Sequence, residues 1–200
     1  MNDANKHPLT RETFDIPETF VVDANVDRKV EFILKNSDLS GATFTGVDLR
    51  GASFDTSDLQ NSSFSNSNLQ GVDLSGSNMK SAHLADVDME DGNLDSANLT
   101  KARFTNAIAI LADLNNVNFH HANFESSNFS DAHLDNATLK NVNFSFSNLQ
   151  SSIFTEANLS NCDFYKANFA GADLREAKLD GALLPPGWVF IQNTNEAGGS

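Results

Sequence analysis

The sequence is poor in several residue types on which other classes of protein depend. Its 200 residues include one cysteine, one tyrosine and one tryptophan, and no proline lies between Pro17 and Pro185. A single cysteine excludes an intramolecular disulfide framework and fits a reducing compartment. The long stretch without proline is typical of a chain whose backbone N–H groups pair throughout its length.

Long apolar segments are also missing. No stretch approaches the roughly 18 apolar residues that suggest a membrane-spanning helix. The first 17 residues contain no apolar core of the kind found in a secretory signal. We therefore expect a soluble, cytoplasmic protein.

Basic residues are scarce relative to acidic ones. The chain has 13 Lys and Arg against 27 Asp and Glu, for a formal net charge of -14. Nucleic acids and anionic membranes are both bound through basic footprints, so direct binding to either is not expected. The charge instead favours a cationic protein partner, or simply solubility.

What the chain does contain is a five-residue repeat. From Leu34 to Leu184 a large apolar residue stands at every fifth position without a slip in register, and the 31 centres include 17 Leu, 11 Phe and two Met, with Ala109 as the exception. Two residues before each centre stands a small residue, except for Phe32 in the first unit. A period of five fits neither a helix nor a flat strand. It predicts a coil that turns a corner at a fixed interval.

The run SDLSG-ATFTG-VDLRG-ASFDT, from Ser37 to Thr56, resembles the pentapeptide-repeat family, and the likeness covers residues 32–186. The resemblance implies an all-β fold, a right-handed quadrilateral parallel β-helix with four pentapeptides per coil. The repeat then makes about eight coils, and at about 4.8 Å between stacked strands the rod is about 35–40 Å long. The centre and the small residue point inward, and the other three positions point outward.

Three segments follow from this repeat. Residues 1–31 form an N-terminal tail and cap, residues 32–186 form the β-helix, and residues 187–200 form a C-terminal cap and a disordered tail. Caps are expected because stacked strands leave an open edge at each end. Several family members dimerise through their C-terminal ends, so the resemblance allows a homodimer through this cap.

No catalytic activity, cofactor or metal site is expected. Cys162 occupies an inward small position, which predicts a buried and inert thiol. Most glycines fall where each unit turns, and none forms a phosphate-binding loop. His120 and His121 are adjacent and outward, but no further metal ligands accompany them in the sequence. A rigid solenoid also lacks the cleft that an active site needs.

Outward charges can be assigned to faces, because residues 20 apart stack when four units make a coil. The face centred on Leu34, Phe54 and Leu74 carries eight acidic and two basic side chains, whereas the next face collects lysines. Acidic side chains are common at solvated positions of such a repeat, but they also form a negative stripe. The candidate partner-binding residues of this stripe are Asp55, Asp73, Asp95, Asp113, Asp135, Glu156 and Asp173.

An apolar run interrupts the polar exterior at residues 107–111, where the large centre is replaced by Ala109. In ideal register its three large residues point outward and form a partner-binding anchor with an acidic rim. Alternatively, a local bulge turns an isoleucine inward to refill the core. Phe146 and Tyr165 form a smaller candidate patch. The candidate residues of the run are Ile108, Ile110 and Leu111.

Two functions fit these features. Some pentapeptide-repeat proteins bind DNA gyrase through an acidic rod surface, so the resemblance implies a non-catalytic, acidic DNA mimic that binds such an enzyme. The ending Leu-Pro-Pro-Gly-Trp, residues 184–188, is similar to uninterrupted cyanobacterial members. That likeness implies a regulatory or scaffold module that binds another protein through the apolar patch or an end cap.

Overall fold

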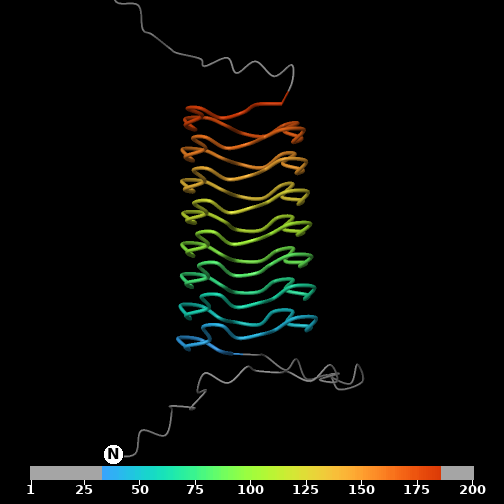
Figure 1. Cartoon of the computed structure of the whole chain (residues 1–200), viewed down its shortest axis with the longest axis vertical. Helices are drawn as coiled ribbons and strands as arrows, with labels where there is room; N and C mark the ends of the chain where they lie inside the picture. The colour runs from blue at the N-terminus through green and yellow to red at the C-terminus, as the bar shows by residue number, and fades with distance from the viewer. Residues whose placement is uncertain (1–32, 186–200) are drawn as a thin grey trace, which may run out of the picture.

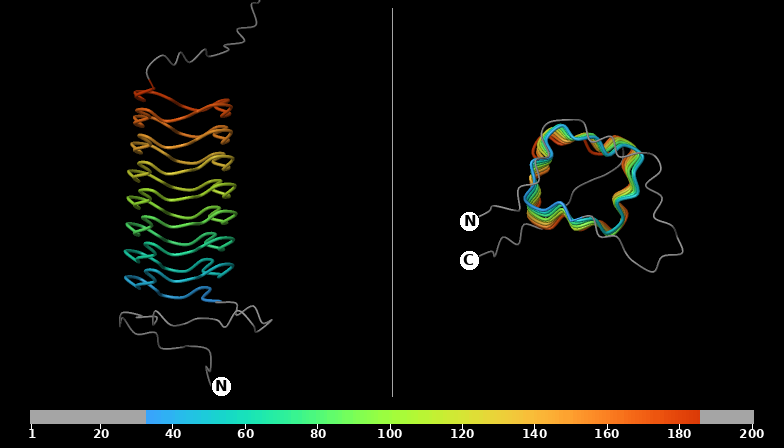
Figure 2. Two further views of the ribbon diagram at one scale, coloured as in Figure 1. Left: turned by 90° about the vertical axis from the view of Figure 1, so that its right-hand side faces the viewer. Right: turned by 90° about the horizontal axis from the view of Figure 1, so that it is seen from below.

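The structure is a computed structural model that describes residues 33–185, which form one upright stack of coils (Figure 1). Seen along the stack, the backbone outlines a four-sided tube (Figure 2). The described residues contain no helix. Both predicted end caps, and with them the homodimer contact, lie outside these residues.

The coils are joined by parallel β-bridges at a constant spacing of 20 residues. The series runs from Ile33–Ser53 to Asp163–Leu183, and in every unit the bridging residue is the one before the centre. Each straight segment contributes one bridge position to the ladder, so the described residues form isolated bridges and no extended strands. Four units therefore complete one coil, which confirms the predicted quadrilateral β-helix.

Backbone hydrogen bonds fasten each coil to the next. In a typical unit, the N–H of the centre Leu59 donates to the carbonyl of Asn78 at 2.8 Å, and the N–H of Asp58 donates back to Ser37 at 2.9 Å. The N–H of the turn residue Asn61 donates to Lys80 at 3.0 Å. Because each unit between the two terminal coils bonds to the coil before it and to the coil after it, these backbone hydrogen bonds hold the rod together without helices.

Every corner of the tube turns through the same backbone conformation. The second residue after each centre has a positive φ in all units from Asn36 to Gly181. In most corners the centre carbonyl accepts a bond from the N–H three residues later, as Leu59 does from Ser62 at 3.1 Å. This is the arrangement of a type II turn, which favours Gly or Asn at the positive-φ position. The turn geometry explains why the two residues after each centre are usually polar or glycine.

Four faces and four edges result from this regularity. Faces 1, 2, 3 and 4 are the straight segments around the centres that stack on Leu34, Leu39, Phe44 and Leu49 respectively. Each edge is the pair of turn residues between two faces, so edge 4/1 joins face 4 to face 1. The names are kept below.

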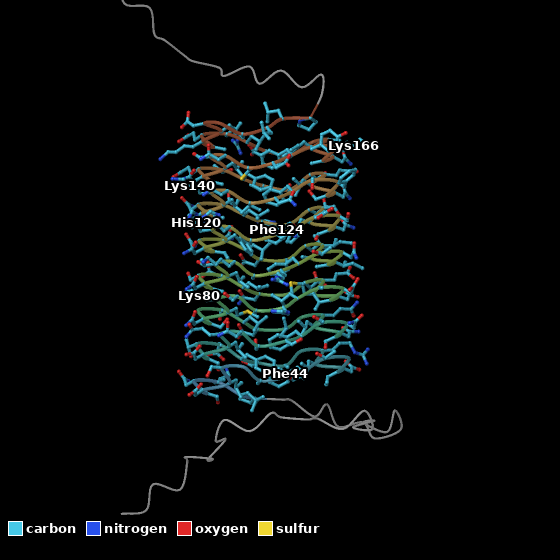
Figure 3. All side chains as sticks on the ribbon, in the orientation of Figure 1. Phe44, Lys80, His120, Phe124, Lys140 and Lys166 are labelled. Carbon is cyan, nitrogen blue, oxygen red and sulfur yellow. The ribbon has the colours of Figure 1, made fainter. Side chains whose placement is uncertain are left out.

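The interior of the tube is a continuous apolar column. The centres and the small residues are buried along almost the whole rod. On face 3 the rings of Phe104 and Phe124 stack with centroids 4.8 Å apart, and Phe124 and Phe144 follow at 5.1 Å. Figure 3 shows Phe124 within the tube. These spacings match the distance between coils, which confirms the predicted inward stacking of the centres.

Candidate functional site

The predicted acidic residues occupy two kinds of position. Three of them stand at the bridge position in the middle of face 1, and four stand in the turns of edge 1/2. Across one coil the two columns are separated only by the centre residue, so their carboxylates form one band along the rod. The face 1 residues are Asp73, Asp113 and Asp173, and the edge 1/2 residues are Asp55, Asp95, Asp135 and Glu156.

The carboxylates in the middle of face 1 also have a structural task. Asp73 accepts a hydrogen bond from the backbone N–H of Ser75, and Asp113 accepts one from Asn115, both at 3.1 Å. Asn93 makes the same bond to the N–H of Asp95 at 3.0 Å. An amide oxygen therefore caps this N–H as well as a carboxylate does. The cap accounts for an oxygen-bearing side chain at this position, but not for a negative charge.

Ion pairs neutralise the two ends of the acidic band. Lys35 lies 3.0 Å from Asp55, and Arg175 lies 2.5 Å from Asp173. A hydrogen bond from Ser53, together with Lys35, lowers the pKa of Asp55, and the hydrogen bonds from Arg175 lower the pKa of Asp173. Both residues are candidate partner-binding residues of the predicted stripe, and the structure gives each of them an ion-pair partner instead.

The middle of the band keeps its charge. Within residues 33–185, no basic side chain forms an ion pair with any of its five carboxylates. They follow one another at close to one per coil, a rise of about 5 Å. We call this set the acidic surface, and its members are Asp73, Asp95, Asp113, Asp135 and Glu156.

The apolar run keeps the regular register. Ile108 bridges Asp88 and Asn128 as any unit does, and Leu111 has the usual corner φ of 58°. Ala109 is fully buried, so the alternative of a bulge that turns an isoleucine inward is wrong. Ile108 and Leu111 are 39% and 52% exposed. We call Ile108, Ile110 and Leu111 the apolar island.

The apolar island borders the acidic surface. Ile110 and Leu111 form the turn of edge 4/1 that leads directly into face 1, where Asp113 stands two residues later. Asp91 occupies the same corner one coil before Leu111, and Asp131 occupies it one coil after. The acidic stripe and the apolar run, which the sequence suggested as separate features, are therefore neighbours around one edge.

Basic side chains gather on edge 2/3, which lies across face 2 from edge 1/2 and diagonally opposite edge 4/1. In Figure 3, Lys80, His120 and Lys140 lie in one column along a single margin of the rod. Lys101 and His121 stand at the second turn position of the same edge. The bridge positions of face 2 beside them hold only Asn and Thr from Asn78 to Asn158. The rod is thus acidic on face 1 and on the two edges beside it, and basic on edge 2/3.

A second exposed apolar group lies on edge 3/4. The rings of Phe146 and Tyr165 meet edge to face with centroids 5.6 Å apart, and the ammonium of Lys166 lies 5.2 and 5.3 Å from the two ring centres. Phe146 is half exposed and has a φ of 59°. We call these three residues the aromatic group. The sequence feature that best indicates this group is Phe146, a phenylalanine at a corner position that favours Gly or Asn.

Residues 33–185 supply no features of a metal or thiol site. They contain no group of three or more His, Cys, Asp or Glu side chains placed to hold a metal ion. Cys162 is buried and donates to the Leu139 carbonyl at 2.9 Å, and burial raises the pKa of its thiol to about 12. Across the same range, no helix is both long and apolar enough to cross a membrane.

Comparison with known proteins gives one family. A model described as "pentapeptide repeat region" matches residues 37–108 and 112–185. No curated protein matches the chain.

Several solved structures are similar to the chain. HetL, a pentapeptide repeat protein involved in heterocyst differentiation regulation from the cyanobacterium Nostoc, is 21% identical with a TM-score of 0.42, over 80% of this chain and 94% of its own. AT2G44920, from the Arabidopsis thaliana thylakoid lumen, is 30% identical with a TM-score of 0.49, over 50% and 69%. The plasmid-mediated fluoroquinolone resistance protein QnrB1 is 19% identical with a TM-score of 0.49, over 77% and 92%.

Proposed function

Because the chain belongs to the pentapeptide-repeat family, we propose that it is a non-catalytic protein-interaction module whose acidic surface binds a DNA-binding enzyme such as DNA gyrase. One observation carries the proposal. The five carboxylates of the acidic surface have no ion-pair partner within residues 33–185, whereas the carboxylates at both ends of the band do. A rigid row of negative charges without ion-pair partners, repeated once per coil, is complementary to a basic surface that normally binds a polyanion such as DNA.

The charge density of the rod falls between those of a neutral surface and a DNA duplex. Residues 33–185 hold 19 acidic and nine basic side chains, for a formal net charge of -10. Over a rod of about 37 Å this gives about one charge per 4 Å, against one per about 1.7 Å in duplex DNA. Charge alone therefore reproduces only part of the attraction of DNA, and the rest of the affinity has to come from other contacts.

The proposal is tested by removing charge without disturbing the fold. A five-residue amide variant changes Asp73, Asp95, Asp113 and Asp135 to Asn and Glu156 to Gln. The cap at Asp73 and Asp113 survives, because Asn makes the same bond elsewhere in the rod. The matched control neutralises five other acids, at Asp58, Asp86, Glu125, Asp163 and Asp180. Both variants have the same net charge and differ only in where the charge is lost.

A DNA gyrase supercoiling assay, with and without ciprofloxacin, provides the measurement. The wild-type protein and the control variant are expected to alter supercoiling at micromolar concentration, and the amide variant is expected to lose at least tenfold in potency. No effect of the wild-type protein on supercoiling rules out gyrase. Equal potency of the two variants rules out the acidic surface as the binding site.

The exposed apolar island favours a second candidate function, a regulatory or scaffold module that binds another protein through this patch. Half-exposed Leu at the border of a charged band is typical of the anchors that carry interface energy. The variant Ile110→Asp, Leu111→Asp would remove such binding and leave the acidic surface intact. In a pull-down compared with the amide variant, partners lost only from the Asp variant indicate the apolar module, and partners lost only from the amide variant indicate the mimic.

A further inference from the structure

The exposed apolar side chains of the rod are not scattered. Apart from Ile33 and Leu183 in the terminal coils, every exposed large apolar side chain among residues 33–185 lies on face 4 or in one of its two edges. The apolar island occupies face 4 and edge 4/1, and the aromatic group occupies edge 3/4. Face 4 is therefore bounded by an apolar anchor on each side.

One residue of each anchor has a backbone conformation that disfavours a large apolar side chain. Leu111 and Phe146 have φ values of 58° and 59°, and they are the only large apolar residues among the positive-φ corners of the described rod. Bulky side chains are strained in this left-handed backbone conformation. Because both side chains are about half exposed to solvent, they also gain little stabilisation from burial. Two unfavourable features at each of two residues, both flanking the same face, point to a use outside folding.

The surface between the anchors is already satisfied. The amide of Asn148 donates to Asn128, and that of Asn168 donates to Asn148, both at 3.0 Å. The oxygens of Asn128 and Asn148 also accept from the backbone N–H groups of Ser130 and Gln150. A partner can cover this ladder without stranding its polar groups, which keeps the cost of desolvation low.

The geometry points to one kind of occupant. Leu111 and Phe146 are a little under two coils apart along the axis and one face apart across it, about 13 Å in all. Apolar residues seven or eight positions apart on a helix are separated by about 11–12 Å. Asp88, Glu90 and Asp91 border the apolar island and call for positive charge in the partner.

We propose that face 4 docks a basic amphipathic helix of a partner protein, held at one edge by the apolar island and at the other by the aromatic group. The inference rests on the second candidate function above, because it specifies what the module binds through the apolar island. The helix lies diagonally over the asparagine ladder, with apolar residues on Leu111 and Phe146 and its basic residues toward edge 4/1. This is the helix-in-groove mode of recognition, on a face instead of in a groove.

A defined probe tests the inference. The probe is a fluorescein-labelled 18-residue peptide of Leu and Lys, with Leu at helical spacing, and its affinity is measured by anisotropy. Leu111→Asn and Phe146→Asn each remove one anchor and place a corner-favouring residue, so both variants are expected to fold. Each is expected to weaken binding about tenfold. The matched control is His121→Asn, an exposed ring at the same type of corner on edge 2/3, which is expected to bind as the wild type does.

The outcomes separate the alternatives. Equal binding of a peptide with Ser in place of Leu shows that charge alone holds the probe and overturns the inference. Loss of affinity in Leu111→Asn but not in Phe146→Asn overturns docking across face 4, while the apolar island of the proposed function stands. A wild-type dimer in sedimentation that Phe146→Asn abolishes shows that a second copy covers face 4, and this also overturns the inference.

Discussion

At the scale of single residues, the corners set the rules of the sequence. Each corner needs one residue with a left-handed backbone, and Gly, Asn or Asp fills most of them. Larger residues such as Lys101 and Glu156 occupy the same conformation at other corners. The cost of such a residue is small against the hydrogen bonds of a whole coil, so the repeat tolerates it. A large apolar residue is the rare case, since among the described corners only Leu111 and Phe146 are of this kind.

A substitution at Asn136 isolates the backbone cost of a corner. Asn136 has a φ of 58° and is exposed. We expect Asn136→Ala to lower the free energy of unfolding by about 1 kcal/mol, because Ala resists a left-handed backbone, and Asn136→Gly to change it little. Urea denaturation followed by circular dichroism measures both. Thr155→Ala, at a first turn position, is the control. Equal stability of the Ala and Gly variants would contradict the corner geometry.

The thiol of Cys162 gives a second test at this scale. Burial raises its pKa from 9.0 to about 12, so the folded protein keeps a proton that the unfolded chain loses. Stability should therefore fall as pH rises from about 9 to about 12, and Cys162→Ser should lose less stability than the wild type over that window. At pH 8.5 the native thiol should resist iodoacetamide and should react once urea unfolds the chain. Rapid alkylation of the native protein would be inconsistent with this burial.

At the scale of the elements, each face is a column of repeated contacts. The residue before the centre bridges the coils and caps a backbone N–H, and the centre fills the tube. The period of the sequence predicts this division of roles, since only one position in five is large and apolar. The period does not predict ion pairing, because Asp55 and Asp95 occupy the same position of the repeat. Asp55 has an ion-pair partner only because the coil before it holds Lys35 at the matching position.

The aromatic column of face 3 gives a prediction at the scale of one element. Phe124 stacks between Phe104 and Phe144 and meets Phe119 and Phe129 edge to face. Phe124→Ala should cost about 3–5 kcal/mol, because the tube cannot close around the lost ring. Phe124→Leu should cost clearly less, since Leu84 occupies the same column. Urea midpoints compare the two, and an Ala variant as stable as the Leu variant would mean that the column relaxes.

At the scale of the whole molecule, sequence distance translates directly into direction. Twenty residues advance one coil, and five residues turn one corner. With this rule the sequence alone could predict which residues of the site are neighbours, because it places Ile108 between Asp88 and Asn128. The sequence could not predict whether residues 107–111 form a bulge or a regular coil, because either arrangement buries small or apolar side chains. The convergence of Leu111 and Phe146 on face 4 also requires the corner conformations.

The same rule allows a test by deletion. Removing residues 132–136, one unit of face 1, moves every later residue back by one face. The interior pattern is unchanged, so the shortened rod should fold with the same circular dichroism spectrum. Phe146 moves to edge 2/3, and the Leu/Lys peptide should bind about as weakly as it binds Phe146→Asn. Removing residues 62–81, a full coil that precedes both Leu111 and Phe146, keeps Phe146 on edge 3/4 at the same spacing from Leu111 and serves as the control. Unchanged binding after the five-residue deletion would contradict docking on face 4.

The separation of charge between face 1 and edge 2/3 has a consequence for encounters in solution. A rod with carboxylates along face 1 and its edges and lysines along edge 2/3 carries an electric dipole perpendicular to its long axis. In the field of a positively charged enzyme, such a rod experiences a torque that rolls it before contact, so that collisions begin with the correct flank forward. Preorientation of this kind raises the association rate constant more than it lowers the dissociation rate constant, and added salt weakens it.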